Sequence, residues 1–152
     1  MDDFKDKVIN ILEETVNAVS EGSRIVQEVL ADGIPGKHTE PERYNRTMVE
    51  FPDIYDITER WMDLVTERIE ISCNLDEIGA EVMHAAGLLT SCYTIFQEID
   101  RYAGLSAKQT LMETLSILLQ SMYKTEEFLR KVISRRNENI DQMYLEPVFE
   151  DE

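Results

Sequence analysis

Proline is concentrated in one short region of this sequence, and that distribution constrains the fold more than any other feature. Three of the four prolines lie between residues 35 and 52, and the whole chain has only six glycines. Proline breaks the interior of a helix and glycine weakens it, so the long segments outside this region are expected to be helical. The sequence therefore predicts an all-α protein whose irregular part is confined to residues 33–52.

Apolar residues recur at helical spacing along four segments. The first helix is expected over residues 2–31 and ends at Asp32-Gly33, and the second is expected over residues 53–73. The third follows a cap at Asn74 and runs to about residue 103, and the fourth follows a cap at Ser106 and runs to about residue 137. Short connections between the last three helices force neighbouring helices to be antiparallel. We therefore expect an up-down-up-down four-helix bundle over residues 1–137, followed by a tail over 138–152.

The connection over residues 33–52 is long for a compact bundle, and loops of this length are often functional. Thr39-Glu40-Pro41-Glu42 has the pattern of a helix start, with Thr39 as the cap and proline early in the first turn. A short helix over about 40–50 would present Tyr44, Met48 and Phe51. Two interpretations stay open for this segment: a lid over one end of the core, or a binding loop in which Tyr44 and Met48 contact a partner.

Small residues point to close helix packing. Gly22 marks a kink or a close crossing in the first helix, since glycine is unfavourable inside a helix without such a reason. The first half of the third helix is also rich in small residues, and we expect them to lie against a neighbouring helix: Gly79, Ala80, Ala85, Ala86 and Gly87. In the fourth helix Ile117 and Tyr123 extend beyond the apolar stripe, so a second copy of the chain could bury them in a homodimer.

Charge excludes several classes of partner. The chain carries 15 Lys and Arg against 31 Asp and Glu, a formal net charge of −16. Such a surface repels phosphate, which argues against nucleic acids and anionic membranes as partners. A protein with a basic surface fits better. A nucleic-acid mimic and a purely solubilising charge are the alternatives.

Cysteine content and hydropathy indicate the compartment. Two cysteines, Cys73 and Cys92, are too few for a disulfide framework, and no apolar run reaches the ~18 residues of a membrane span. The first residues lack the basic and apolar regions of a signal peptide. These features predict a cytoplasmic protein, and no sequence pattern calls for a cofactor.

Glu81 and His84 form the one residue pair whose spacing matches that of known chemical sites. A Glu-x-x-His pair places both side chains on one helix face, and such pairs resemble the metal ligands of di-iron bundles. The second pair that such a site requires is missing. His84 followed by Ala85, Ala86 and Gly87 also resembles histidine-containing phosphotransfer domains, although the lysine of that motif is absent here. We therefore expect no metal site, and we keep chemistry at Glu81 and His84 as the alternative.

The tail combines acidic and apolar residues. Residues 138–152 carry six acids and no Lys or Arg, interleaved with Met143, Tyr144, Leu145, Val148 and Phe149. The tail either docks on the bundle or binds a partner as a short linear motif. Gln142, Leu145 and Phe149 resemble the spacing of sliding-clamp-binding peptides, and Val148 departs from that pattern.

The sequence thus favours a small acidic protein-binding module of adaptor, chaperone or inhibitor type, and not an enzyme. Its candidate contact residues are Tyr44 and Met48 in the loop, and Tyr144, Leu145, Val148 and Phe149 in the tail. The alternatives are a bundle with chemistry at Glu81 and His84, and a structural homodimer without a client.

Overall fold

The computed structural model describes residues 2–67, 73–98 and 105–135. All regular structure in these ranges is α-helical. The helices are α1 (Asp2–Asp32), α2 (Pro41–Glu50), α3 (Tyr55–Glu67), α4 (Cys73–Glu98) and α5 (Leu105–Ser134). None of the helices in these ranges is long and apolar enough to cross a membrane.

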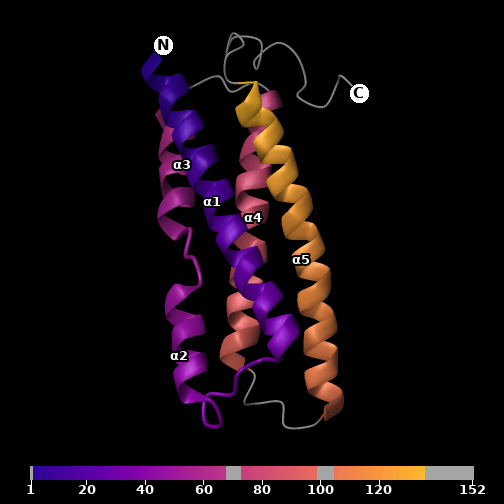
Figure 1. Ribbon diagram of the computed structural model, residues 1–152. Helices are drawn as coiled ribbons and strands as arrows, with labels where there is room; N and C mark the ends of the chain where they lie inside the picture. The colour runs from indigo at the N-terminus through magenta and orange to yellow at the C-terminus, as the bar shows by residue number, and fades with distance from the viewer. Residues whose placement is uncertain (1, 68–72, 99–104, 136–152) are drawn as a thin grey trace.

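Four columns of helix make up the bundle (Figure 1). The long helices α1, α4 and α5 form three of them, and α2 and α3 follow one another along one side as the fourth. Successive columns run in opposite directions, and α1 packs against α5, α3 and α4, while α4 packs against α5 and α3. The predicted four-helix bundle is therefore confirmed, with one column divided in two.

The core follows the predicted apolar stripes. Its largest fully buried side chains come from α1, α4 and α5: Val8, Leu12, Val19, Val26, Val29, Leu75, Ile78, Phe96, Leu115, Met122 and Leu129. Trp61 joins them from α3 with 5% of its surface exposed. Burying one such aliphatic side chain stabilises a fold by roughly 1.5–3 kcal/mol, so this core is the main source of stability.

Of the three glycines within the described helices, Gly22 and Gly79 lie at close helix crossings, as predicted. A Cβ atom at Gly22 would overlap the Leu89 side chain and lie 3.1 Å from Cε of Met122. At Gly79 it would lie 2.9 Å from Cε2 of Trp61. The expectation is wrong for Ala80, which is exposed, and for Gly87, where a Cβ would meet nothing within 4 Å. Gly87 lies on the solvent side of α4, so packing does not require a glycine there.

The ends of α1 and α2 show how glycine and proline set helix boundaries. Gly33 ends α1 with φ +91°, and its N–H donates to the carbonyl of Val29 at 2.7 Å, which confirms the predicted stop. The helix at 41–50 is also confirmed, but the predicted Thr39 cap is wrong. The N-cap is Glu40, with no side-chain cap hydrogen bond. Proline disfavours the helical conformation in the residue before it, so the helix begins at Pro41 itself.

Two other predicted caps are also wrong. Asn74 lies inside α4, whose described part begins at Cys73, and Ser106 lies inside α5, which begins at Leu105. Packing along a helix fixes its first turn as strongly as capping side chains do, so sequence patterns place boundaries only to within one or two residues. The predicted extensions over 68–72, 99–104 and 136–137 lie outside the described residues, as does the tail over 138–152.

Candidate functional site

The corner between α2 and α3 is held by an inward-facing aromatic side chain. Phe51 follows α2 in an extended conformation before Pro52, and its N–H donates to the carbonyl of Thr47 at 3.0 Å. Its ring meets Phe96 of α4 edge-on at 5.4 Å between centroids and lies 6.2 Å from Tyr93. With 6% of its surface exposed, Phe51 anchors the corner to α4.

A cavity of about 530 Å³ opens between this corner and α4. Its walls include Met48, Val49, Phe51 and Tyr55 on the corner side and Leu89 and Tyr93 on the α4 side. Val49 is 83% exposed and Tyr55 is 65% exposed. Large apolar groups at the mouth of an apolar cavity are typical of a surface that contacts another molecule.

Of the two loop residues predicted to contact a partner, Met48 lines this cavity and Tyr44 does not. Met48 lines the cavity and is half-buried against the core. Tyr44 is also half-buried, but it is not among the residues that line the cavity. Sequence reasoning missed Val49 and Tyr55, because their exposure depends on how α2 and α3 meet.

Carboxylates surround this corner. Asp53 lines the cavity, and its Oδ1 accepts a hydrogen bond from the N–H of Tyr55 at 3.0 Å. Arg60 binds Asp56 at 3.0 Å and Glu14 at 2.5 Å, and the hydrogen bond that it donates to Glu14 raises the pKa of Arg60. The charge of Arg60 is thus neutralised within the surface. Its neighbour Glu59 is exposed, so the corner remains acidic.

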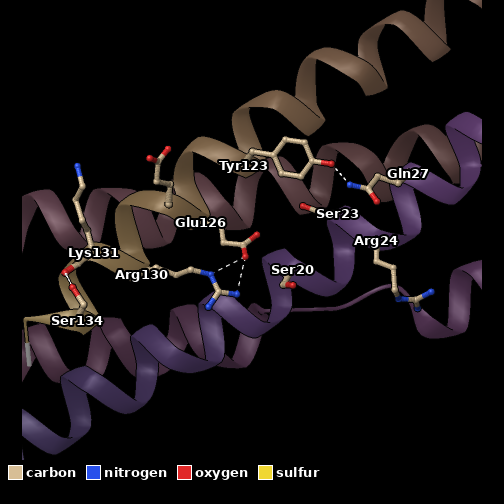
Figure 2. A pocket seen from close by; sticks show the side chains of 10 residues that line it. Ser20, Ser23, Arg24, Gln27, Tyr123, Glu126, Arg130, Lys131 and Ser134 are labelled. Carbon is tan, nitrogen blue, oxygen red and sulfur yellow. Dashed lines mark hydrogen bonds and ion pairs between the residues drawn. The ribbon is translucent and has the colours of Figure 1, made fainter.

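A second, polar groove of about 900 Å³ lies between α1 and α5 (Figure 2). One end is bridged by the amide of Gln27, which donates to the hydroxyl of Tyr123. Farther along, Arg130 binds Glu126 at 2.8 Å. Lys131 and Ser134 line the end of the groove nearest the C-terminus of α5. The sequence signal for this groove is the run of basic residues at the end of the fourth helix.

The floor of this groove carries an unsatisfied hydroxyl. Ser20 and Ser23 present small side chains from α1, and Ser23 is only 4% exposed. No described group forms a hydrogen bond with Ser23 Oγ. Such a buried hydroxyl is unusual, since most buried polar atoms have a partner.

Arg24 belongs to the edge of the groove and not to its interior. It binds Glu21 and Glu28, each at 2.5 Å, and its side chain points away from α5 in Figure 2. The hydrogen bond that Arg24 donates to Glu21 lowers the pKa of Glu21 and raises the pKa of Arg24. Arg24 also lies 3.7 Å from Glu50 of α2, so its charge is neutralised by α1 and α2 and not by α5.

Glu81 and His84 do not converge on a common ligand. Oε1 of Glu81 accepts a hydrogen bond from the hydroxyl of Thr125 on α5 at 3.2 Å, whereas His84 is exposed. Over residues 2–67, 73–98 and 105–135, no group of three or more His, Cys, Asp or Glu side chains could hold a metal ion. Glu81 thus takes part in the contact between α4 and α5.

Cys92 lies in the core, as its place on the apolar stripe predicts. Burial raises the pKa of its thiol to about 12, and its sulfur lies 4.0 Å from that of Met122. A thiol in this environment is a poor nucleophile.

The four tail residues with a predicted contact role lie outside the described residues: Tyr144, Leu145, Val148 and Phe149. Comparison with protein-family models, curated proteins and solved structures found no match to this chain. Function is therefore argued from the two surfaces themselves.

Proposed function

We propose that this chain is a non-enzymatic protein-binding module, and that the corner between α2 and α3 is its contact surface. One observation carries the proposal. Val49 and Tyr55 are exposed where they line a largely apolar cavity, whose wall includes the buried Phe51 ring that packs on Phe96. Exposed apolar anchors beside a preformed cavity are a common arrangement in protein interfaces.

The charge around the corner supports a basic partner. Asp53 and Glu59 are exposed there, and the chain as a whole carries a net charge of −16. A partner helix with one apolar anchor and flanking Lys or Arg would place the anchor in the cavity and its cations near these acids. Helices bind apolar grooves in this way, and opposite charges accelerate the encounter.

Glu81 has a packing role that requires no chemistry. It accepts a hydrogen bond from Thr125 of α5, and His84 is exposed on α4. Among the described residues, no group of three or more His, Cys, Asp or Glu side chains could hold the ion of the metal alternative. The His84→Ala variant tests the phosphotransfer alternative.

Affinity capture with surface variants tests the proposal. The full-length chain is immobilised beside a Val49→Asp variant and a matched Ile117→Asp variant, and partners are recovered from a lysate of the source organism. Both substituted residues are exposed, at 83% and 68%, so each variant should keep its fold, which circular dichroism checks.

We expect a protein with a basic surface to be recovered by the wild type and by Ile117→Asp, but not by Val49→Asp. Calorimetry with the recovered protein should then show at least a roughly tenfold loss of affinity, about 1.4 kcal/mol. Equal capture by all three chains would place the interface elsewhere. Recovery of nothing but a second copy of the chain would favour the structural homodimer.

A further inference from the structure

The groove between α1 and α5 has the features of a binding site that is independent of the α2–α3 corner. Its floor is formed by the small residues Ser20 and Ser23, and its α5 wall carries Arg130 and Lys131 beside Glu126 and Glu127 (Figure 2). Arg130 is paired with Glu126 at 2.8 Å, so Lys131 is the cation of this wall for which no ion pair is described. The hydroxyl of Ser23 is buried and has no hydrogen-bond partner within the described ranges. A ligand in this groove would supply that partner and would meet the cations at the end of the groove nearest Ser134.

We propose that this groove binds an acidic, aromatic peptide segment, and that its occupant is the chain's own C-terminal segment, residues 138–152. Tyr144 and Phe149 would lie over the two serines. The carboxylates of the segment would pair with Arg130 and Lys131. A backbone carbonyl or the Tyr144 hydroxyl would accept a hydrogen bond from Ser23.

Charge supports this occupant. Residues 128–135 of the chain contain three basic residues, Arg130, Lys131 and Arg135, and no acid, although the net charge of the whole chain is −16. Residues 138–152 contain six acids and no Lys or Arg. The most acidic segment thus directly follows the most basic one. Opposite charges fixed next to one another on one chain attract at a high effective concentration.

Length and position allow the segment to return along the groove. The groove follows α5 from Tyr123 to Ser134, which is about 17 Å at the helical rise of 1.5 Å per residue. The described chain ends at Arg135, beside the open end of the groove. An extended chain spans at most about 3.3 Å per residue, so residues 143–149 lie within roughly 26–46 Å of that end. This reach leaves room for a reversal of direction before the segment enters the groove.

Composition supports docking over a fully solvated segment. Six apolar side chains occur among residues 138–152, and acids alone would suffice to keep the segment in water: Ile140, Met143, Tyr144, Leu145, Val148 and Phe149. Partial removal of two aromatic side chains from water would add to the hydrogen bond and the ion pairs, and the ion pairs would fix the direction of the segment.

Paramagnetic relaxation in the full-length chain tests this placement. A nitroxide spin label is attached at Asn17→Cys, an exposed position one turn before Ser20 and outside the groove lining, in a Cys73→Ser background. Cys92 is buried with a raised thiol pKa and should not react with the label. A control label is placed at Met62→Cys, which is 57% exposed on α3. Amide signals of residues 143–149 are then recorded by NMR with the label oxidised and reduced.

We expect the Asn17 label to broaden the signals of residues 143–149, and the Met62 label to leave them sharp. The double variant Arg130→Glu, Lys131→Glu should abolish this broadening, whereas the matched pair Lys108→Glu, Lys124→Glu on the same helix should preserve it. All four of these side chains are exposed, so the bundle should remain folded.

Two results overturn the proposal. One is an absence of broadening from the Asn17 label in the otherwise unsubstituted chain. The other is broadening that persists undiminished when spin-labelled, unenriched chains are mixed with enriched, unlabelled chains, because the segment would then occupy the groove of a second copy. Neither result bears on the α2–α3 corner, which the Val49→Asp variant tests separately.

Discussion

Gly22 of α1 faces Leu89 of α4 across a gap too narrow for a methyl group. A Cβ at position 22 would overlap the Leu89 side chain and crowd Met122 of α5. Three helices therefore meet at one glycine, near the level at which Pro52 divides α2 from α3. The packing geometry of the bundle therefore depends on the absence of a side chain at Gly22, in addition to the apolar residues of the core.

Gly22→Ala should destabilise the protein. The added methyl group must displace Leu89 or Met122, and overpacking of this kind costs about 1–3 kcal/mol. The better helix propensity of alanine offsets about 1 kcal/mol of that loss. Urea denaturation followed by circular dichroism should show a lower free energy of unfolding.

Gly87→Ala is the matched control, and it should have the opposite effect. A Cβ at position 87 meets nothing within 4 Å, so only the gain in helix propensity remains, about 0.5–1 kcal/mol. A destabilised Gly87→Ala protein would contradict the solvent-facing position of this residue.

Phe51→Ala should lower the free energy of unfolding much more than Tyr55→Ala. Phe51 is buried against Phe96 and Tyr93, so its truncation should cost about 3–5 kcal/mol of unfolding free energy. Tyr55 is 65% exposed, and its truncation should change stability by no more than about 0.5 kcal/mol. Thermal or urea unfolding measures both effects, and similar losses in the two variants would be inconsistent with the described corner.

The thiol of Cys92 should react with Ellman's reagent only after unfolding. In a Cys73→Ser background the native protein should release almost no chromophore at pH 8, and one equivalent should appear in denaturant. The physical reason is burial, which raises the pKa of the thiol from 9.0 to about 12.

The same shift gives a pH dependence. The folded pKa is raised, so the stabilising contribution of the neutral thiol is complete below the unfolded pKa and is lost as the pH rises towards about 12. Compared with Cys92→Ala, the protein with Cys92 should therefore lose more stability between pH 9 and 12. Equal pH profiles of the two proteins would contradict this, because they would mean that folding does not change the pKa of the Cys92 thiol.

Thr125→Val should destabilise the contact between α4 and α5. The buried hydroxyl of Thr125 donates to the Glu81 carboxylate, and loss of a hydrogen bond to a charged group costs about 1.5–3 kcal/mol. In a Glu81→Ala background the same substitution should cost less, which a double-mutant cycle measures.

His84→Ala tests the alternative of chemistry on this face. His84 is exposed, and we expect a change in unfolding free energy within about 0.5 kcal/mol and unchanged partner capture. Loss of partner capture or of any activity, without loss of stability, would return His84 to the candidate functional residues.

The sequence by itself determined the helical architecture. Apolar spacing gave the core positions on all the long helices, and Gly33 and Pro41 set two helix boundaries through their own backbone chemistry. These properties are local, because a side-chain period and a restricted φ angle act within a few residues. The predicted caps at Thr39, Asn74 and Ser106 failed. Pro41 sets the start of α2, and Asn74 and Ser106 lie inside the described parts of α4 and α5.

Only the tertiary structure decided which small and exposed residues matter. Gly79 and Gly87 occupy the same helix in similar sequence surroundings, yet one meets Trp61 and the other meets solvent. Likewise, the exposure of Val49 and Tyr55 and the groove beside Ser23 arise where two helices meet. A helical period specifies which face is apolar, but not which neighbour covers it. That neighbour is fixed by the mutual fit of all four columns, which depends on contacts between residues far apart in the chain.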